Sequence, residues 1–202
     1  NHQHPNGNRL ANFRACTHSS CWFSRLSSVT RKRLSGHSAQ SAASALVEAR
    51  LPEFVRTMQM EAGFTESDAT GEVHRAIQTL KLSAEEARRL AGDVVPLAGA
   101  PQQAGRLGFT LRVPLGVVAA ITPFNAPLNT VAHKIAPAFA AGNAAILKPA
   151  SFTPLTACKL AQALIDAGMP RGFLSVLMGG AQVAQWVLED ERVRFFAFTG
   201  ST

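Results

Sequence analysis

The sequence predicts an α/β protein in which N-terminal helices precede a parallel sheet with flanking helices. From Leu107 onward, runs with strand character alternate with segments of helical spacing, a pattern typical of strand-helix-strand units and hence of a parallel sheet. Residues 41–92 have helical spacing instead. Apolar residues make up 47% of the chain, enough for a buried core, so disorder is excluded for most of its length.

Three parts are expected along the chain. Residues 1–40 form an irregular or foreign basic segment without sustained periodicity, and 41–106 form an N-terminal helical segment. Residues 107–202 form the part with the sheet.

The positive charge lies almost entirely at the N-terminal end. Residues 1–47 carry six basic side chains and no acidic ones, and residues 48–202 carry 14 basic and 13 acidic side chains, a net charge of +1. A basic balance confined to one end, with few interleaved aromatics, does not favour a nucleic-acid partner. Three interpretations of this end stay open: an organelle-targeting segment, a metal site of Cys16, His18, Cys21 and His37, or sequence foreign to the fold. Because a second close Cys or His pair is missing, no metal site is expected.

Several classes of protein are disfavoured. No run of eighteen uncharged apolar residues occurs, so no membrane span is expected. Three cysteines cannot form a disulfide framework for a chain of this size, which fits a reducing, cytoplasmic compartment, with organelle targeting as the lesser alternative. The G-x-G-x-x-G pattern of common dinucleotide folds is absent.

Two apolar faces are expected in the helical segment. Pro52 marks a kink or a restart, and Gly63 and Gly92 end helices. The first face has Ala45, Leu46, Ala49, Phe54, Val55 and Met58, and the second has Val73, Ile77, Leu80, Leu82 and Leu90.

Strands and helices alternate in the last part of the chain. The expected strands are 107–113, 116–122, 144–148, 174–178 and 193–199. A helix begins near Pro127 and stops at Gly142. The next helix has Thr153 as its N-cap and Pro154 as its first residue, and Gly168 and Pro170 follow its end.

Polar and glycine residues follow successive strands. Ligands of open parallel sheets bind beyond the carboxyl ends of the strands. At these positions the chain would supply an amide from Asn125, a cation from Lys148 and closely approaching backbone from Gly179-Gly180 and residues 199–202. Each alone is compatible with a turn or surface role, but together they predict a site for an anionic dinucleotide and a developing oxyanion.

Five segments resemble the aldehyde dehydrogenase superfamily in order and spacing: 114–128, 141–149, 153–157, 167–172 and 198–202. The resemblance runs from about Ala42 to Thr202. It implies an incomplete, Rossmann-like dinucleotide-binding domain over 107–202 and NAD or NADP as cofactor.

The resemblance also implies residue roles. Asn125 matches the catalytic asparagine that holds the oxyanion, and Lys148 matches a lysine that contacts the adenosine ribose. Ser151 stands where many NAD-preferring members have a glutamate. This replacement leaves the choice of NAD or NADP open. Ser201 matches a pyrophosphate contact, and Gly200 lies near the nicotinamide. Gly180 matches the first glycine of a pair whose second position is Ala184, and Lys134 matches a frequent lysine for which a structural role is at least as plausible. Residues expected to form the cofactor wall are Ile121, Thr122, Pro123 and Phe124.

The implied activity is the oxidation of an aldehyde to a carboxylic acid through a cysteine thiohemiacetal. The family's nucleophilic cysteine and its glutamate lie beyond the motif at 198–202, and Cys158, assigned to the core, does not replace the cysteine. The 202 residues are therefore expected to be an inactive fragment of a homo-oligomeric parent enzyme. The alternative is a non-catalytic nucleotide-binding or interaction module, or a decayed remnant.

Overall fold

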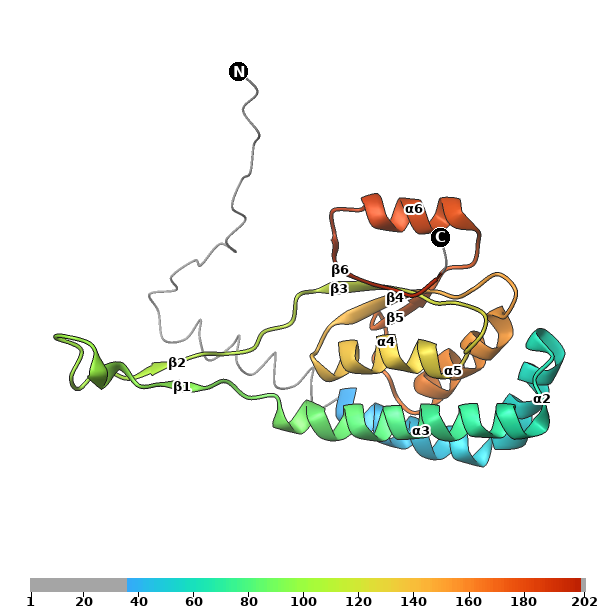
Figure 1. The fold of residues 1–202 in the computed structure, drawn as a ribbon, viewed down its shortest axis with the longest axis horizontal. Coiled ribbons are helices and arrows are strands. Elements are labelled where there is room, and N and C mark those ends of the chain that lie inside the picture. The colour runs from blue at the N-terminus through green and yellow to red at the C-terminus, as the bar shows by residue number, and fades with distance from the viewer. Residues whose placement is uncertain (1–35, 201–202) are drawn as a thin grey trace, which may run out of the picture.

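A computed structural model describes residues 36–200. Its four-stranded sheet is parallel throughout, with the strand order β5-β4-β3-β6 (Figure 1). The strands are β3 (Val117–Ile121), β4 (Ala144–Lys148), β5 (Leu174–Val176) and β6 (Val193–Phe198). Four of the five expected strands are thus confirmed, the largest difference in their bounds being two residues.

Helices cover both faces of this sheet. On one face lie α4 (Asn129–Ala140) and α5 (Pro154–Asp166), and on the other lies α6 (Ala181–Glu189) (Figure 1). A second helical layer, formed by α2 (Leu51–Ala62) and α3 (Glu66–Arg89), packs on α4 and α5. The helical residues 36–49 precede α2.

Local signals in the sequence set the bounds of the N-terminal helices. Pro52 occupies the first turn of α2, so it marks a restart. Gly63 ends α2 with φ 66°, a left-handed conformation that glycine adopts without strain. Thr65 is the N-cap of α3, and its side chain accepts a hydrogen bond from the backbone N–H of Asp68 at 3.1 Å.

The expected irregular segment and the first apolar face are partly wrong. Residues 36–40 are already helical, and Ala39 and Gln40 are buried. Ala45 and Ala49 are exposed, whereas Ala43 and Val47 are buried. The buried face of the first helix differs from the predicted one because Pro52 separates two helices, so a single periodicity does not continue across it.

Residues 90–113 differ most from expectation. The helical segment expected up to residue 106 ends with α3 at Arg89, and Gly92 lies beyond that end. The strand expected at 107–113 shortens to β2 (Gly108–Phe109), which pairs antiparallel with β1 (Val94–Val95) and not with the parallel sheet. This two-stranded ribbon, with the short 3-10 helix η1 (Leu97–Gly99), projects from the body (Figure 1).

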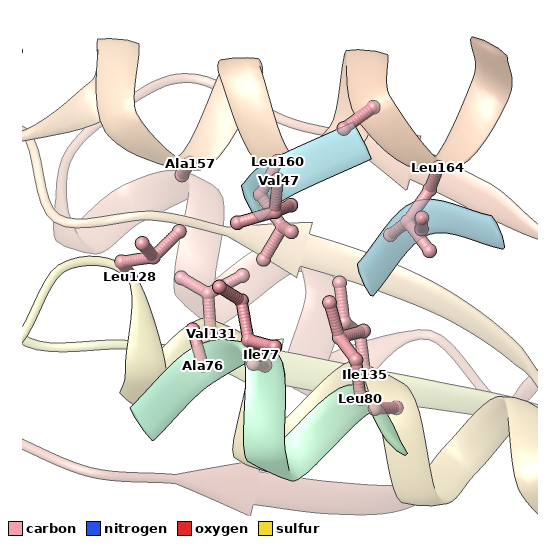
Figure 2. Packing of buried hydrophobic residues seen from close by; sticks show 14 of the residues in the cluster. Val47, Ala76, Ile77, Leu80, Leu128, Val131, Ile135, Ala157, Leu160 and Leu164 are labelled. Carbon is pink, nitrogen blue, oxygen red and sulfur yellow. The ribbon is translucent and has the colours of Figure 1, made fainter. Parts of the chain in front are cut away.

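The main core lies between the sheet and the outer helices. Figure 2 shows Ile77 and Leu80 of α3 facing Val131 and Ile135 of α4. Leu160 and Leu164 of α5 and Val47 of the first helix belong to the same buried cluster. The N-terminal helices therefore share one core with the sheet.

Within the described residues, none of the helices combines the length and the apolar character needed to cross a bilayer.

Candidate functional site

The chain reverses its direction of travel across the sheet between β3 and β6. It passes from β3 outward to β4 and β5, and then returns through α6 to place β6 on the other side of β3. In parallel sheets this reversal opens a crevice at the carboxyl ends of the strands. We call this end of the sheet the carboxyl edge.

The loop after β3 brings two side chains to the surface at this edge. Ile121 and Thr122 are buried, and the backbone N–H of Thr122 donates to the Lys148 carbonyl at 3.3 Å. Pro123 is half-buried, whereas Phe124 and Asn125 are exposed. The Asn125 amide is thus carried on a loop whose first residues are fixed.

Lys148 ends β4 as a buried lysine, with 8% of its surface exposed. Its Nζ donates to the carbonyl of Pro149 at 3.2 Å. Burial lowers the pKa of the Lys148 ammonium, because desolvation penalises the charged form. An anionic ligand at this edge would stabilise the charge.

Two contacts link the loops after β3, β4 and β5. Ser151 is exposed, and its Oγ donates to the carbonyl of Gly179 at 3.2 Å. The rings of Phe124 and Phe152 meet edge to face, with centroids 6.2 Å apart. Residues that the sequence places at separate strand ends are therefore neighbours.

At the end of β6, Thr199 joins this group. Its N–H donates to the Ile121 carbonyl at 3.1 Å, and its Oγ1 accepts a hydrogen bond from Lys134 Nζ at 2.7 Å. Desolvation lowers the pKa of Lys134 as well. The sequence left open whether Lys134 has a structural role on its helix, and its ammonium reaches the carboxyl edge. Gly200 is exposed beside Thr199, and Ser201 lies outside the described residues.

The three helices that follow the sheet strands differ at their N-termini. Glu72 of α3 accepts the N–H of Asn129 at the start of α4, at 2.9 Å. Glu61 of α2 accepts hydrogen bonds from Leu155 N and, at 2.8 Å, from Thr156 N at the start of α5. Thr153, the expected cap of α5, makes no side-chain capping hydrogen bond. Sequence reasoning missed both glutamates, because each acts across more than fifty residues.

No side chain within the described residues caps the N-terminus of α6. Gly180 is the N-cap of this helix, and a Cβ added to it would have no neighbour within 4 Å. At Gly179, φ is +147° and a Cβ would lie 2.4 Å from Val183 Cγ2, so glycine is required there. Ala184, at the second position of the expected pair, is half-buried. Within residues 36–200 the first amides of α6 thus have no side-chain acceptor, an arrangement suited to a phosphate.

Three of the four residues of the metal hypothesis fall outside the described residues, whereas Cys158, which was assigned to the core, lies within them. Cys16, His18 and Cys21 lie outside the described residues, and within 36–200 no three His, Cys, Asp or Glu side chains form a metal-binding group. His37 Nδ1 lies 2.7 Å from the Ala84 carbonyl. Cys158 is half-buried on α5, where burial and then the charge of Glu61 raise its thiol pKa.

The comparisons with known proteins agree on one family. The 3-sulfolactaldehyde dehydrogenase of Priestia aryabhattai is 50% identical over 157 residues, which cover 77% of this chain and 33% of that protein. The crystal structure of an aldehyde dehydrogenase from Physcomitrella patens with the product succinate superposes with a TM-score of 0.80 at 35% identity. This match covers 89% of this chain and 38% of that one. The chain thus spans about a third of the length of the curated relatives it matches.

Two further solved structures bear on the cofactor. A glyceraldehyde-3-phosphate dehydrogenase from Methanocaldococcus jannaschii, complexed with NADP, matches with a TM-score of 0.77 at 30% identity over 90% of this chain and 41% of that one. An NAD-dependent benzaldehyde dehydrogenase from Corynebacterium glutamicum matches with a TM-score of 0.78 at 30% identity over 89% and 39%. NAD or NADP is therefore the cofactor that the structural neighbours support.

The model of the aldehyde dehydrogenase family matches residues 28–202. The match begins before Ala42, where the sequence motifs first indicated it, and agrees with the helical structure of residues 36–40. Motifs, fold and matched length lead to the same result: the chain belongs to the aldehyde dehydrogenase family.

Proposed function

We propose that this chain supplies the dinucleotide platform and the oxyanion donor of an NAD(P)-dependent aldehyde dehydrogenase, which oxidises an aldehyde to a carboxylic acid. The observation that carries the proposal is the carboxyl edge. Ser151 bonds there to the Gly179 carbonyl, just before the start of α6, and the ends of β3, β4 and β6 carry Asn125, Lys148 and Thr199. These groups fit a dinucleotide, because amide donors and a cation match its pyrophosphate and ribose oxygens.

Each part of the edge has a proposed role. The first amides of α6, opened by Gly180, hold the pyrophosphate together with Ser201, while Lys148 and Ser151 bind the adenosine ribose. The wall along the cofactor is formed by Ile121, Thr122, Pro123 and Phe124. Gly200 leaves room for the nicotinamide, which accepts a hydride when the cofactor is bound.

Asn125 is proposed as the donor to the oxyanion. Its amide is exposed on a loop whose first residue is held to β4. A neutral donor fixed in advance stabilises negative charge that develops on a carbonyl oxygen, an effect worth about 3 to 4 kcal/mol in the barrier.

The division of the chain, its assembly and its location belong to the same proposal. Residues 36–89 are a helical support, and 114–200 form the cofactor domain.

The apolar ribbon of β1 and β2 exposes Val94, Leu107 and Phe109, which supports a homo-oligomer. Sedimentation velocity tests the homo-oligomer: the wild type should sediment as an oligomer, and Phe109→Asp should dissociate it into monomers. A cytoplasmic location is supported by the low cysteine count, and cell fractionation tests it.

Isothermal titration of the 202-residue chain with NAD⁺ and NADP⁺ tests the proposed platform. Binding of at least one dinucleotide is expected, and Lys148→Ala should weaken it by about tenfold or more, since a charge-assisted hydrogen bond contributes about 1.5 to 3 kcal/mol. The matched control is Lys159→Ala, because Lys159 pairs with Glu53 on the outer side of α5. Absence of binding, or equal losses in both variants, would contradict the platform.

Ser151 leads to a prediction about cofactor choice. A carboxylate at this exposed position would repel a ribose 2′-phosphate, so Ser151→Glu should weaken NADP⁺ binding about tenfold more than NAD⁺ binding. The ratio of the two dissociation constants is the measurement. Ser151→Gln, of equal size and without charge, is the control, and an equal change in both variants would remove the electrostatic explanation.

A further inference from the structure

The buried carboxylate of Glu72 is the strongest polar feature next to the proposed site that has no assigned role. Only 2% of this residue is exposed. One oxygen, Oε1, accepts the backbone N–H of Asn129 at 2.9 Å, and the other, Oε2, accepts a hydrogen bond from Arg75 at 2.8 Å. Both oxygens are therefore engaged, and one of them holds the first residue of α4.

A second group on α3 holds the same residue. Thr79 Oγ1 lies 3.0 Å from Asn129 Oδ1 and 3.0 Å from the Arg75 carbonyl, so its one proton is shared between these two acceptors. Thr79 follows Glu72 by seven residues, two helical turns along the same face of α3. Side chains of one helix, α3, thus hydrogen-bond to both the backbone and the side chain of Asn129.

The loop that carries Asn125 runs between two fixed ends. At its start, the N–H of Thr122 bonds to β4, and at its end Leu128 is fully buried in the main core. Asn125 lies four residues before Asn129, in the exposed middle of the loop. Where α4 begins therefore limits where the Asn125 amide points.

We propose that Glu72 is a positioning residue, which sets the orientation of the Asn125 amide by fixing the start of α4 through Asn129. The inference rests on the proposed function, because an oriented Asn125 matters for the reaction only if Asn125 is the oxyanion donor. Glu72 itself is buried behind α4 and does not reach a substrate.

The chain contains a matched control in Glu61. This glutamate holds the start of α5 in the same manner, accepting hydrogen bonds from Thr156 N at 2.8 Å and Thr156 Oγ1 at 2.6 Å. Its removal should loosen α5 to a similar degree, and it can affect the Asn125 loop only indirectly, through the contact between the Phe124 and Phe152 rings.

The test uses ¹H–¹⁵N spectra and amide hydrogen exchange of the 202-residue chain. The side-chain amide of Asn125 is assigned by its loss in Asn125→Asp. In Glu72→Ala this resonance should shift, and exchange at the Asn129 amide should rise about tenfold, because its acceptor is gone. Glu72→Gln keeps an acceptor oxygen and should restore both, since the mostly exposed Arg75 can turn to water. Glu61→Ala should raise exchange at Leu155 and Thr156 only.

Thr79→Val removes the second hold on Asn129 while leaving the buried carboxylate in place, so it tests the idea if Glu72→Ala fails to fold. It should move the same Asn125 resonance. An unmoved Asn125 resonance in these variants, or an equal shift in Glu61→Ala, overturns the proposal. Dinucleotide titration of the wild type is a separate reading: a wild type that binds neither dinucleotide refutes the proposed function, whereas the resonance shifts still decide the positioning.

Discussion

Burial controls the chemistry of the ionisable side chains next to the sheet. Lys134 and Lys148 are partly or largely withdrawn from water, so the pKa of each is lowered, and each hydrogen-bonds to an oxygen at the carboxyl edge. A desolvated ammonium gains more from an arriving anion than an exposed one does. These two residues therefore concentrate positive charge where the cofactor is proposed to bind.

Cys158 allows a prediction about pH dependence. Because burial and Glu61 raise the pKa of its thiol, the thiolate forms at a higher pH than in a free cysteine. Alkylation of Cys158 by iodoacetamide should be slow near neutral pH and increase as the pH rises, and Glu61→Gln should shift this increase to lower pH by removing the repelling charge. Mass spectrometry of the peptide containing Cys158 gives the rates.

The urea-unfolded chain is the reference for this measurement, because Cys158 is fully accessible there. If the native thiol reacts at neutral pH as fast as the unfolded one, the predicted suppression is absent, and if it reacts faster, Cys158 is activated. An activated Cys158 would become a candidate nucleophile.

At the scale of elements, the starts of the two central helices depend on outer helices. Glu72 of α3 holds α4, and Glu61 of α2 holds α5. The N-termini of α4 and α5 are thus engaged by carboxylates of the protein, which is favourable for both helix dipoles. Of the three helices that follow sheet strands in residues 36–200, only α6 keeps a start without a side-chain partner, and this favours α6 as the phosphate site.

Loss of Glu61 should therefore destabilise the fold. Glu61→Ala leaves the Leu155 and Thr156 amides without their acceptor, at a cost of about 1 to 3 kcal/mol in the free energy of unfolding. Urea denaturation measures this. The control Glu53→Ala removes a more exposed ion pair with Lys159, which contributes about 0 to 1 kcal/mol. Equal losses in the two variants would argue against the capping role.

At the scale of the whole molecule, one core connects the sheet to both helical layers. Residues from the first helix, α2, α3, α4 and α5 share a single buried cluster, whereas the α6 face has a small one of Ala119, Val187 and Val193. Strand β6 exposes Phe195, Phe196 and Phe198. The stability of the described part therefore comes mainly from the α4 and α5 side of the sheet.

Neighbouring residues of α5 test this distribution. Leu164 is fully buried and Ile165 is 55% exposed, although they are adjacent in sequence. Leu164→Ala should lower the free energy of unfolding by about 2 to 5 kcal/mol, whereas Ile165→Ala should change it by about 0.5 kcal/mol. Chemical denaturation of both variants measures the difference. A large loss for Ile165→Ala would show that the outer face of α5 is covered in solution.

The accuracy of the sequence prediction follows the range of the signals. Helix α5 lies within its predicted bounds because Pro154 and Gly168 act on their own backbone. The segment 107–113 was assigned to the parallel sheet wrongly, since a run of alternating apolar residues looks the same in an exposed ribbon as in a half-buried strand. Its partner β1, residues 94–95, is too short to produce a pattern of its own.

The sequence by itself determined the family, the alternation of strands and helices, and the strand ends that bring Asn125, Lys148 and Ser151 to one edge, because these depend on motifs and local preferences. Only the tertiary structure decided which groups meet at the carboxyl edge: Lys134 with Thr199, Ser151 with Gly179, and Glu72 with the start of α4. Partners far apart in the chain leave no local pattern, and the packing of helices on the sheet alone brings them together.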